Sequence, residues 1–185
     1  MKHLFLLLLT QTIFAVNMIN LTLDPNPAYI IENNQLGEDY LNSHAYGNAA
    51  LSIGYSQDIY NTEHFLLSGG GEFMMGRKSE GKRAMFSIHS VYLSPTLIVD
   101  ERVHLFTRLG YNIVNADTEI SSFDSLSGGF NFGVGLSYKV TDNYVLSFQN
   151  ILHQTSGEDN GVEYDFVYNR YGLVLSYGID LIKGD

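Results

Sequence analysis

Residue types that acid–base and nucleophilic chemistry uses are gathered in one stretch of this 185-residue sequence, HQTSGEDNGVEY, from His153 to Tyr164. His153 stands two residues before Thr155, and the amide Asn160 and the carboxylate Glu163 follow. The same composition is typical of a polar turn after a strand, because Ser, Gly, Asp and Asn favour turns. The chemistry of this candidate site therefore depends on the elements that position it.

A second set of candidate residues is charged or basic. These residues occur in segments where apolar and polar residues alternate, at the positions between the apolar residues. Charges enclosed in a low-dielectric interior need partners, and one acid among several bases is under-paired unless water enters. Three interpretations are open: a structural plug, a narrow gated conduit, or no network at all. The residues of this candidate interior network are Glu72, His104, Arg108, Lys139 and Arg170.

The sequence lacks the residue patterns that several other kinds of binding site require. The chain has no cysteine, and its six histidines show no metal-ligand spacing such as His-x-x-x-His. Gly69-Gly70-Gly71 precedes no expected helix, so it is not a phosphate loop. The formal net charge of −10 argues against nucleic acid as a partner. We expect no metal site and no cofactor.

The N-terminus has the pattern of a secretory signal peptide. Lys2 precedes the apolar run from Leu4 to Leu9, and polar residues and Ala15 follow. The run is too short to cross a bilayer as a helix. We expect export after cleavage near residue 15.

Alternation of apolar with small or polar residues dominates the rest of the chain and predicts strands. The clearest example runs from Phe130 to Tyr138. A change of phase around His89-Ser90 suggests a bulge. Short and longer links alternate between these segments, and an even strand count requires one more strand within 17–34. The seven alternating segments are 45–55, 65–75, 84–98, 103–113, 130–138, 144–154 and 171–179.

The face opposite the apolar residues distinguishes a membrane barrel from a soluble one. It carries mostly Gly, Ser, Ala and Asn and few charges, which suits the crowded interior of a narrow barrel. A soluble exported barrel, the alternative, would carry many charges on its outer face. Tyr55, Tyr138, Tyr144 and Tyr177 stand near strand ends, where a membrane barrel has an aromatic girdle. The sequence thus favours an all-β, eight-stranded antiparallel up-and-down transmembrane β-barrel.

The segments LFTRLGYNI, GGFNFGVGLSYKVTDNYVLSFQ and RYGLVLSYGI resemble the eight-stranded outer-membrane barrels related to the transmembrane domain of outer-membrane protein A. The resemblance covers about Arg102 to Ile179 and implies the architecture rather than an activity. That family usually ends on an aromatic residue, whereas this chain continues after Ile179 with DLIKGD.

The stretch from His153 also resembles, more weakly, the motif of the lipid A 3-O-deacylase family. That resemblance implies His153 as base, Thr155 as nucleophile, Asn160 as oxyanion donor and Glu163 as the acid that orients the histidine. The family has Ser where this chain has Thr155, and Ser156 is one residue away.

We therefore expect residues 1–15 as signal peptide, 16–44 as a weakly patterned first strand and first outer loop, 45–180 as barrel and 181–185 as periplasmic tail. The expected function is structural or surface-interacting, in a porin-like outer-membrane protein whose interior is plugged by side chains. A lipid A hydrolase is the alternative, and an adhesin residing in the outer loops is a third possibility. Expected partners are outer-membrane lipids, lipopolysaccharide and the barrel assembly machinery, with the protein a monomer.

Overall fold

The computed structural model describes residues 16–25, 28–33, 38–43, 49–78, 84–118, 122–123, 128–159 and 162–179. The expected signal peptide, the expected periplasmic tail and Asn160 lie outside these residues. Among the described residues, no helix is long and apolar enough to cross a membrane.

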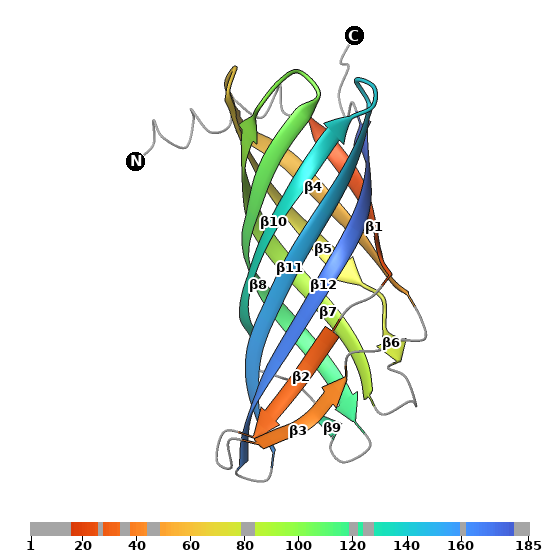
Figure 1. The fold of residues 1–185 in the computed structure, drawn as a ribbon, viewed down its shortest axis with the longest axis vertical. Coiled ribbons are helices and arrows are strands. Elements are labelled where there is room, and N and C mark those ends of the chain that lie inside the picture. Colours follow the sequence, from red (N-terminus) through yellow and green to blue (C-terminus); the bar gives the residue numbers. More distant parts are fainter. Residues whose placement is uncertain are drawn as a thin grey trace, which may run out of the picture.

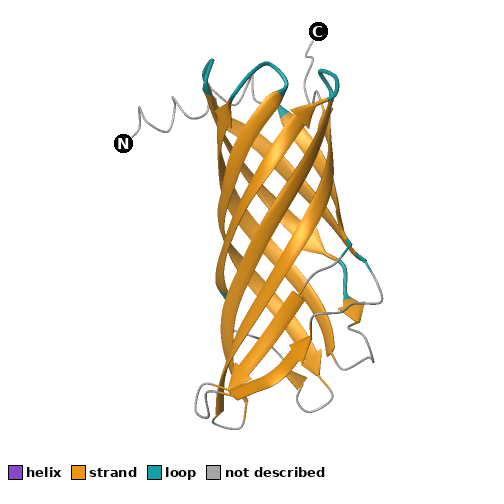
Figure 2. Cartoon of the chain, in the orientation of Figure 1, coloured by secondary structure: helices purple, strands orange, loops and turns teal. Residues whose placement is uncertain are grey.

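Eight antiparallel strands form a closed ring, which confirms the expected fold class (Figure 1; Figure 2). Strand β1 pairs with β4 on one side and with β12 on the other, so the ring has no open edge. The ring order is β1, β4, β5, β7, β8, β10, β11, β12. Their bounds are β1 Asn17–Asp24, β4 Ala50–Asn61, β5 Phe65–Met74, β7 Ala84–Ile98, β8 Val103–Thr118, β10 Gly129–Lys139, β11 Tyr144–Asp159 and β12 Val162–Ile179.

The first strand occupies the beginning of the expected range. In β1, Leu21 lies opposite Leu175 of β12 and opposite Ile53 of β4, so apolar side chains meet on one face across both seams. A slip of one residue would turn this whole set to the other face, and the alternation therefore fixes the register.

The end of the barrel with the longer loops carries more sheet than the sequence indicated. Strands β11 and β12 stay paired as far as Asp159 and Val162, so the stretch expected to be a loop after Gln154 is a β-ribbon. Strand β2 (Ala28–Asn33) pairs with residues 164–169 of β12, and β3 (Glu38–Ser43) pairs with β2. Two short strands, β6 (Arg77–Lys78) and β9 (Ser122–Phe123), lie at the same end (Figure 1).

The three short turns share one hydrogen-bonding device. The first residue of each turn uses its side-chain oxygen to accept the backbone N–H three residues later: Thr62 from Phe65 at 3.1 Å, Asp100 from Val103 at 2.8 Å and Thr141 from Tyr144 at 3.1 Å. In each turn the backbone N–H of the first residue donates to the carbonyl of that same later residue. Local side-chain acceptors of this kind stabilise tight turns. The backbone N–H groups of Arg102 and Val103, which donate to the Asp100 carboxylate, also lower its pKa.

The two faces of the ring differ as the alternation predicted. In β10, Phe132, Val134 and Leu136 are exposed on the outside, whereas the side chain of Asn131 is buried inside. The bulge expected at His89-Ser90 is wrong, because β5 and β7 keep one register from Phe65↔Leu97 to Phe73↔His89. The change of phase has another cause: Ile88 points inward and is buried, while Val91 faces outward.

Pro95 interrupts one ladder in the middle of the sheet. The pairing of β7 with β8 is unbroken on both sides of Ser94 and Pro95 but skips these two residues. Proline has no N–H to donate. The hydroxyl of Ser94 donates instead to the carbonyl of Thr107 at 3.0 Å, which compensates for the missing backbone donor.

Candidate functional site

The interior of the barrel is the candidate site, because the buried polar and charged side chains of the ring strands point into it. These groups are arranged in layers along the axis. A chamber lies at the short-turn end, a cluster of ion pairs lies at its inner end, and the polar residues Asn112, Asn131 and His153 and an apolar layer lie toward the long-loop end.

The ion cluster consists of Asp24, Glu72, Arg108 and Arg170, which come from β1, β5, β8 and β12. Arg170 donates from Nη2 to Glu72 Oε1 at 2.6 Å and from Nη1 to Asp24 Oδ2 at 3.0 Å. Arg108 donates from Nη1 to the other oxygen of Glu72. Every member is less than a tenth exposed. Two carboxylates and two guanidinium groups balance, so the enclosed charge is neutral overall.

Neighbouring groups hold the two arginines in place. Arg108 donates to Ser90 Oγ at 2.5 Å, and its guanidinium carbon lies 3.9 Å from the centroid of the Tyr92 ring. Arg170 donates to Ser52 Oγ at 3.1 Å. A Cβ on Gly70 would lie 2.7 Å from the Tyr92 ring, so the absence of a side chain at Gly70 makes room for that ring. Cation–π contacts and hydrogen bonds to hydroxyl oxygens stabilise guanidinium groups that are buried away from water.

The candidate network of the sequence divides into two parts in the structure. Glu72, Arg108 and Arg170 meet in the ion cluster. His104 and Lys139 lie nearer the short-turn end, where Lys139 pairs with Asp142 at 2.9 Å and keeps 38% of its side chain exposed.

Sequence reasoning missed Asp24, the second acid of the cluster. The alternation of Asn20, Thr22 and Asp24 against Leu21 and Leu23 already marks it as inward-facing. It was not recognised because the position of the first strand was not fixed by the sequence.

An apolar layer fills the barrel beyond the ion cluster. Its side chains come from several strands and are almost completely buried, including the large rings of Phe166 and Tyr168. Side chains packed in this way fill the interior of a narrow barrel at this level. The layer consists of Met74, Ile88, Val114, Ile151, Phe166 and Tyr168.

His153 lies inside the barrel beside this layer. It is 0% exposed, its Nδ1 lies 3.3 Å from Asn112 Oδ1, and its ring centroid lies 6.2 Å from that of Tyr168. Within the described part of the chain, His153 Nε2, Asn112 Nδ2 and both side-chain polar atoms of Asn131 have no hydrogen-bond partner.

Of the residues compared with the deacylase motif, Asn160 lies outside the described residues, and Glu163 is not brought to His153 and Thr155. His153 and Thr155 point inward and are buried, whereas Glu163 is exposed on β12, opposite Glu158. Because adjacent positions of a ribbon alternate in direction, Glu163 faces away from His153. A lipid ester outside the barrel has no access to a fully buried imidazole, so the arrangement does not favour hydrolysis.

The outside of the barrel is a continuous apolar belt. Leu21, Ile53, Leu109 and Leu173 are each more than two-fifths exposed, and many other large apolar residues on the ring strands share this state. A water-soluble monomer rarely exposes an apolar patch of this extent. Tyrosines border the belt at the short-turn end, where the rings of Tyr144 and Tyr177 lie 5.0 Å apart. Hydrocarbon is the environment that fits such a surface.

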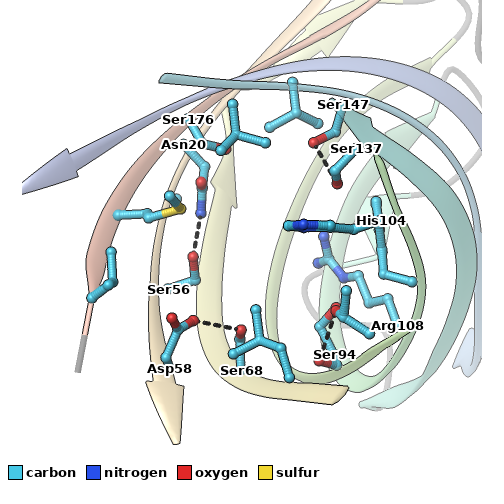
Figure 3. A pocket seen from close by; sticks show the side chains of 18 of the residues that line it. Asn20, Ser56, Asp58, Ser68, Ser94, His104, Arg108, Ser137, Ser147 and Ser176 are labelled. Atoms are coloured by element: carbon cyan, nitrogen blue, oxygen red, sulfur yellow. Dashed lines mark hydrogen bonds between the residues drawn. The ribbon is translucent and has the colours of Figure 1, made fainter. Parts of the chain in front are cut away.

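The chamber at the short-turn end has a volume of about 290 Å³ (Figure 3). Its walls are rich in hydroxyl and amide groups that are bonded along the wall, as Asn20 to Ser56 at 3.0 Å and Ser147 to Ser137 at 2.9 Å. Glu72 and Arg108 form its inner end. Within the described residues, no group of three His, Asp or Glu side chains is placed to hold a metal ion.

No protein-family model matches this sequence, and the search of curated proteins found no match. Among solved structures, neisserial surface protein A is similar over 88% of this chain and 97% of its own, with 16% identity and a TM-score of 0.52. The attachment invasion locus protein Ail of Yersinia pestis is similar over 85% and 98%, with 13% identity and a TM-score of 0.46. OprG of Pseudomonas aeruginosa is similar over 89% and 95%, with 11% identity and a TM-score of 0.42. The likeness to neisserial surface protein A supports the barrel fold and carries no statement about activity.

Proposed function

We propose that this protein is a small outer-membrane β-barrel without an open pore, which anchors a sheet of β-structure at the cell surface for interaction. The plugged interior is the observation that carries the proposal. An ion cluster and an apolar layer block the axis in succession, so the protein is not suited to conduct solutes. The apolar belt fits a bilayer, which leaves the exposed end of the barrel as the part that meets partners.

The sheet beyond the belt supports the surface role. On β12 the outward-facing residues change from Leu173 and Tyr171 through Asn169 and Val167 to Asp165 and Glu163 toward the long-loop end. On β11 the outward Asn150 donates to Asn169 at 2.7 Å, at about the level of this change. Ordered strands therefore continue into water, and β2 and β3 widen the sheet there.

The environment and partners of the protein follow from this proposal. Lipids of the outer membrane, including lipopolysaccharide, surround the belt. The barrel assembly machinery inserts the chain after signal-peptide export. The protein acts as a monomer, because each strand of the ring is paired on both sides, and the edge of the sheet at the six-residue strand β3 lies beyond the ring.

Ion flux from vesicles tests the plugged interior. Purified protein reconstituted into potassium-loaded vesicles is expected to give no more efflux than vesicles without protein. A general porin in matched vesicles provides the positive control. Steady efflux that rises with the amount of folded protein would remove the proposal.

Presentation at the cell surface needs a separate test. An epitope tag between Asp159 and Val162 is expected to bind antibody on intact cells, whereas a tag in the turn at Asp142 is expected to do so only after the outer membrane is opened. Replacing residues 28–43 by a short flexible link is expected to leave heat-modifiable migration intact and to reduce attachment of the cells to surfaces. Unchanged attachment would place the interaction elsewhere.

The hydrolase alternative has its own measurement. Mass spectrometry of lipid A from cells producing the protein, beside cells producing His153→Ala, is expected to show the same number of acyl chains. Loss of one acyl chain only in cells with the unsubstituted protein would restore the enzyme.

A further inference from the structure

The chamber at the short-turn end is bounded at its inner end by buried charged side chains, and the apolar layer lies beyond them. Its inner end is formed by Glu72 and Arg108 of the ion cluster and by Tyr92, whose ring packs against the Arg108 guanidinium. The mouth is surrounded by residues at strand ends, among them Val16 and Asn61. A closed chamber of this kind suits binding rather than passage.

The volume suits a small molecule. About 290 Å³ lies near the lower limit for ligand pockets and equals the volume of roughly ten waters. The wall hydroxyls are bonded to neighbouring strands, yet a serine oxygen has two lone pairs and one proton. Ser56, Ser137 and Ser147 can therefore make further hydrogen bonds to a solute in the chamber.

A carboxylate stands on one wall of the chamber. Asp58 of β4 accepts a hydrogen bond from Ser68 Oγ at 2.9 Å (Figure 3). In the described part of the chain, no Lys, Arg or His lies within ion-pair distance of Asp58. Asp58 is only partly exposed, so a cationic partner would gain more from this carboxylate than from one on an open surface.

Basic groups stand across the chamber from Asp58. In the ring of eight strands, β4 and β10 are four steps apart in both directions, so Lys139 of β10 belongs to the opposite wall. His104 of β8 lies next to that wall, and Figure 3 shows it across the chamber from Asp58 and Ser68. Lys139 also pairs with Asp142 at 2.9 Å, but Asp142 is 97% exposed, so this pair is weak and leaves Lys139 able to contact a solute in the chamber.

We propose that the chamber binds a small zwitterionic solute, with its ammonium group at Asp58 and its anionic group near His104 and Lys139. The neutral hydroxyl walls hydrogen-bond the part of the solute between its charges. An anion alone would leave Asp58 without a cationic partner, and a cation alone would make no contact with His104 or Lys139 on the opposite side. The proposed site is at the opposite end of the barrel from the surface sheet.

Titration of the full-length protein in phospholipid nanodiscs tests this site, with glycylglycine as the probe and NMR shifts of chamber residues as the signal. Saturable shifts are expected with glycylglycine, and binding about ten-fold weaker is expected for acetate, methylammonium and glycerol. Asp58→Asn is isosteric, keeps an acceptor for Ser68 and is expected to weaken glycylglycine about ten-fold. Asp165→Asn, on the outward face of β12 near the opposite end of the barrel, is the matched control and is expected to bind as the unsubstituted protein does.

Three results would overturn the proposal. They are the absence of a saturable shift with glycylglycine, equal affinity for glycerol, and affinity unchanged in Asp58→Asn. Heat-modifiable migration of each variant establishes that its barrel is folded before its affinity is compared.

Discussion

At the scale of single residues, Glu72 is the group on which the interior depends most. It contacts both Arg108 and Arg170, and all three side chains are buried. Removing one partner of a buried ion pair is costly because the remaining charge loses its compensation. An exposed pair such as Lys139 with Asp142 contributes far less.

We expect Glu72→Gln to lower the free energy of unfolding by about 3 kcal/mol, since two guanidinium groups lose their shared counter-charge. Urea titration of the protein in lipid vesicles measures this difference. The control is Lys139→Gln, for which a change of less than about 1 kcal/mol is expected. Equal effects of the two substitutions would show that the ion cluster does not stabilise the fold.

At the scale of elements, adjacent glycines in β5 have different roles because they face opposite sides of the sheet. A Cβ on Gly70 would meet the backbone oxygen of Tyr55 at 2.6 Å and the Tyr92 ring at 2.7 Å. A Cβ on Gly71 would meet only the carbonyl of Ser90, at 3.6 Å. The inward glycine therefore makes room for the Tyr92 ring that supports Arg108, and the outward one tolerates a methyl group.

Gly70→Val is expected to lower the free energy of unfolding by about 1–3 kcal/mol through overpacking against Tyr55 and Tyr92. Gly71→Ala, its matched control, is expected to stay within about 0.5 kcal/mol of the unsubstituted protein. Urea unfolding in vesicles checks both. If Gly71→Ala were the more damaging variant, the assigned faces of β5 would be reversed.

The short turns are a second feature of this scale. Thr141→Val keeps the shape of the side chain and removes the oxygen that accepts the N–H of Tyr144. We expect a loss of about 1 kcal/mol in unfolding free energy, the usual contribution of one such hydrogen bond. Thr141→Ser retains the acceptor and should behave as the unsubstituted protein does. A similar loss in the serine variant would mean that the methyl group matters instead.

At the scale of the whole molecule, the seam between β1 and β12 decides whether the sheet is a barrel. Asn20 of β1 lies opposite Ser176 of β12, although 155 intervening residues separate them in the sequence. Both side chains point into the barrel and line the chamber. Every other ring pairing joins two ring strands that follow one another in the chain with at most two short strands between them, and within the described residues this pairing closes the ring.

Cysteines introduced at this seam test the closure, because the natural chain has none. Directly opposite residues of antiparallel strands lie within the reach of a disulfide. Asn20→Cys with Ser176→Cys is therefore expected to oxidise to a cross-linked form that migrates faster on non-reducing gels. The pair Asn20→Cys and Ser137→Cys, on strands three steps apart, is expected to stay reduced. Cross-linking of the second pair alone would contradict the strand order.

The sequence by itself determined which face of most ring strands is apolar, but not the position of the first strand or the added strands β2 and β3. Alternation such as Phe130, Phe132 and Val134 against Asn131 and Gly133 has a period of two, and that period is a local property of a strand. The inward direction of Glu72, Arg108 and Arg170 followed from the same pattern. The membrane environment was predicted from composition, because small and polar residues oppose the apolar ones.

Only the tertiary structure decided which inward residues meet. Contacts such as Arg170 with Asp24 join residues far apart in the sequence, and a period of two gives no distance along the barrel axis. The ring order and the register of each strand pair set the position of each inward residue along the axis. For the same reason the sequence grouped Lys139 with Glu72, whereas closure of the ring placed Lys139 near the mouth and Asp24 in the ion cluster.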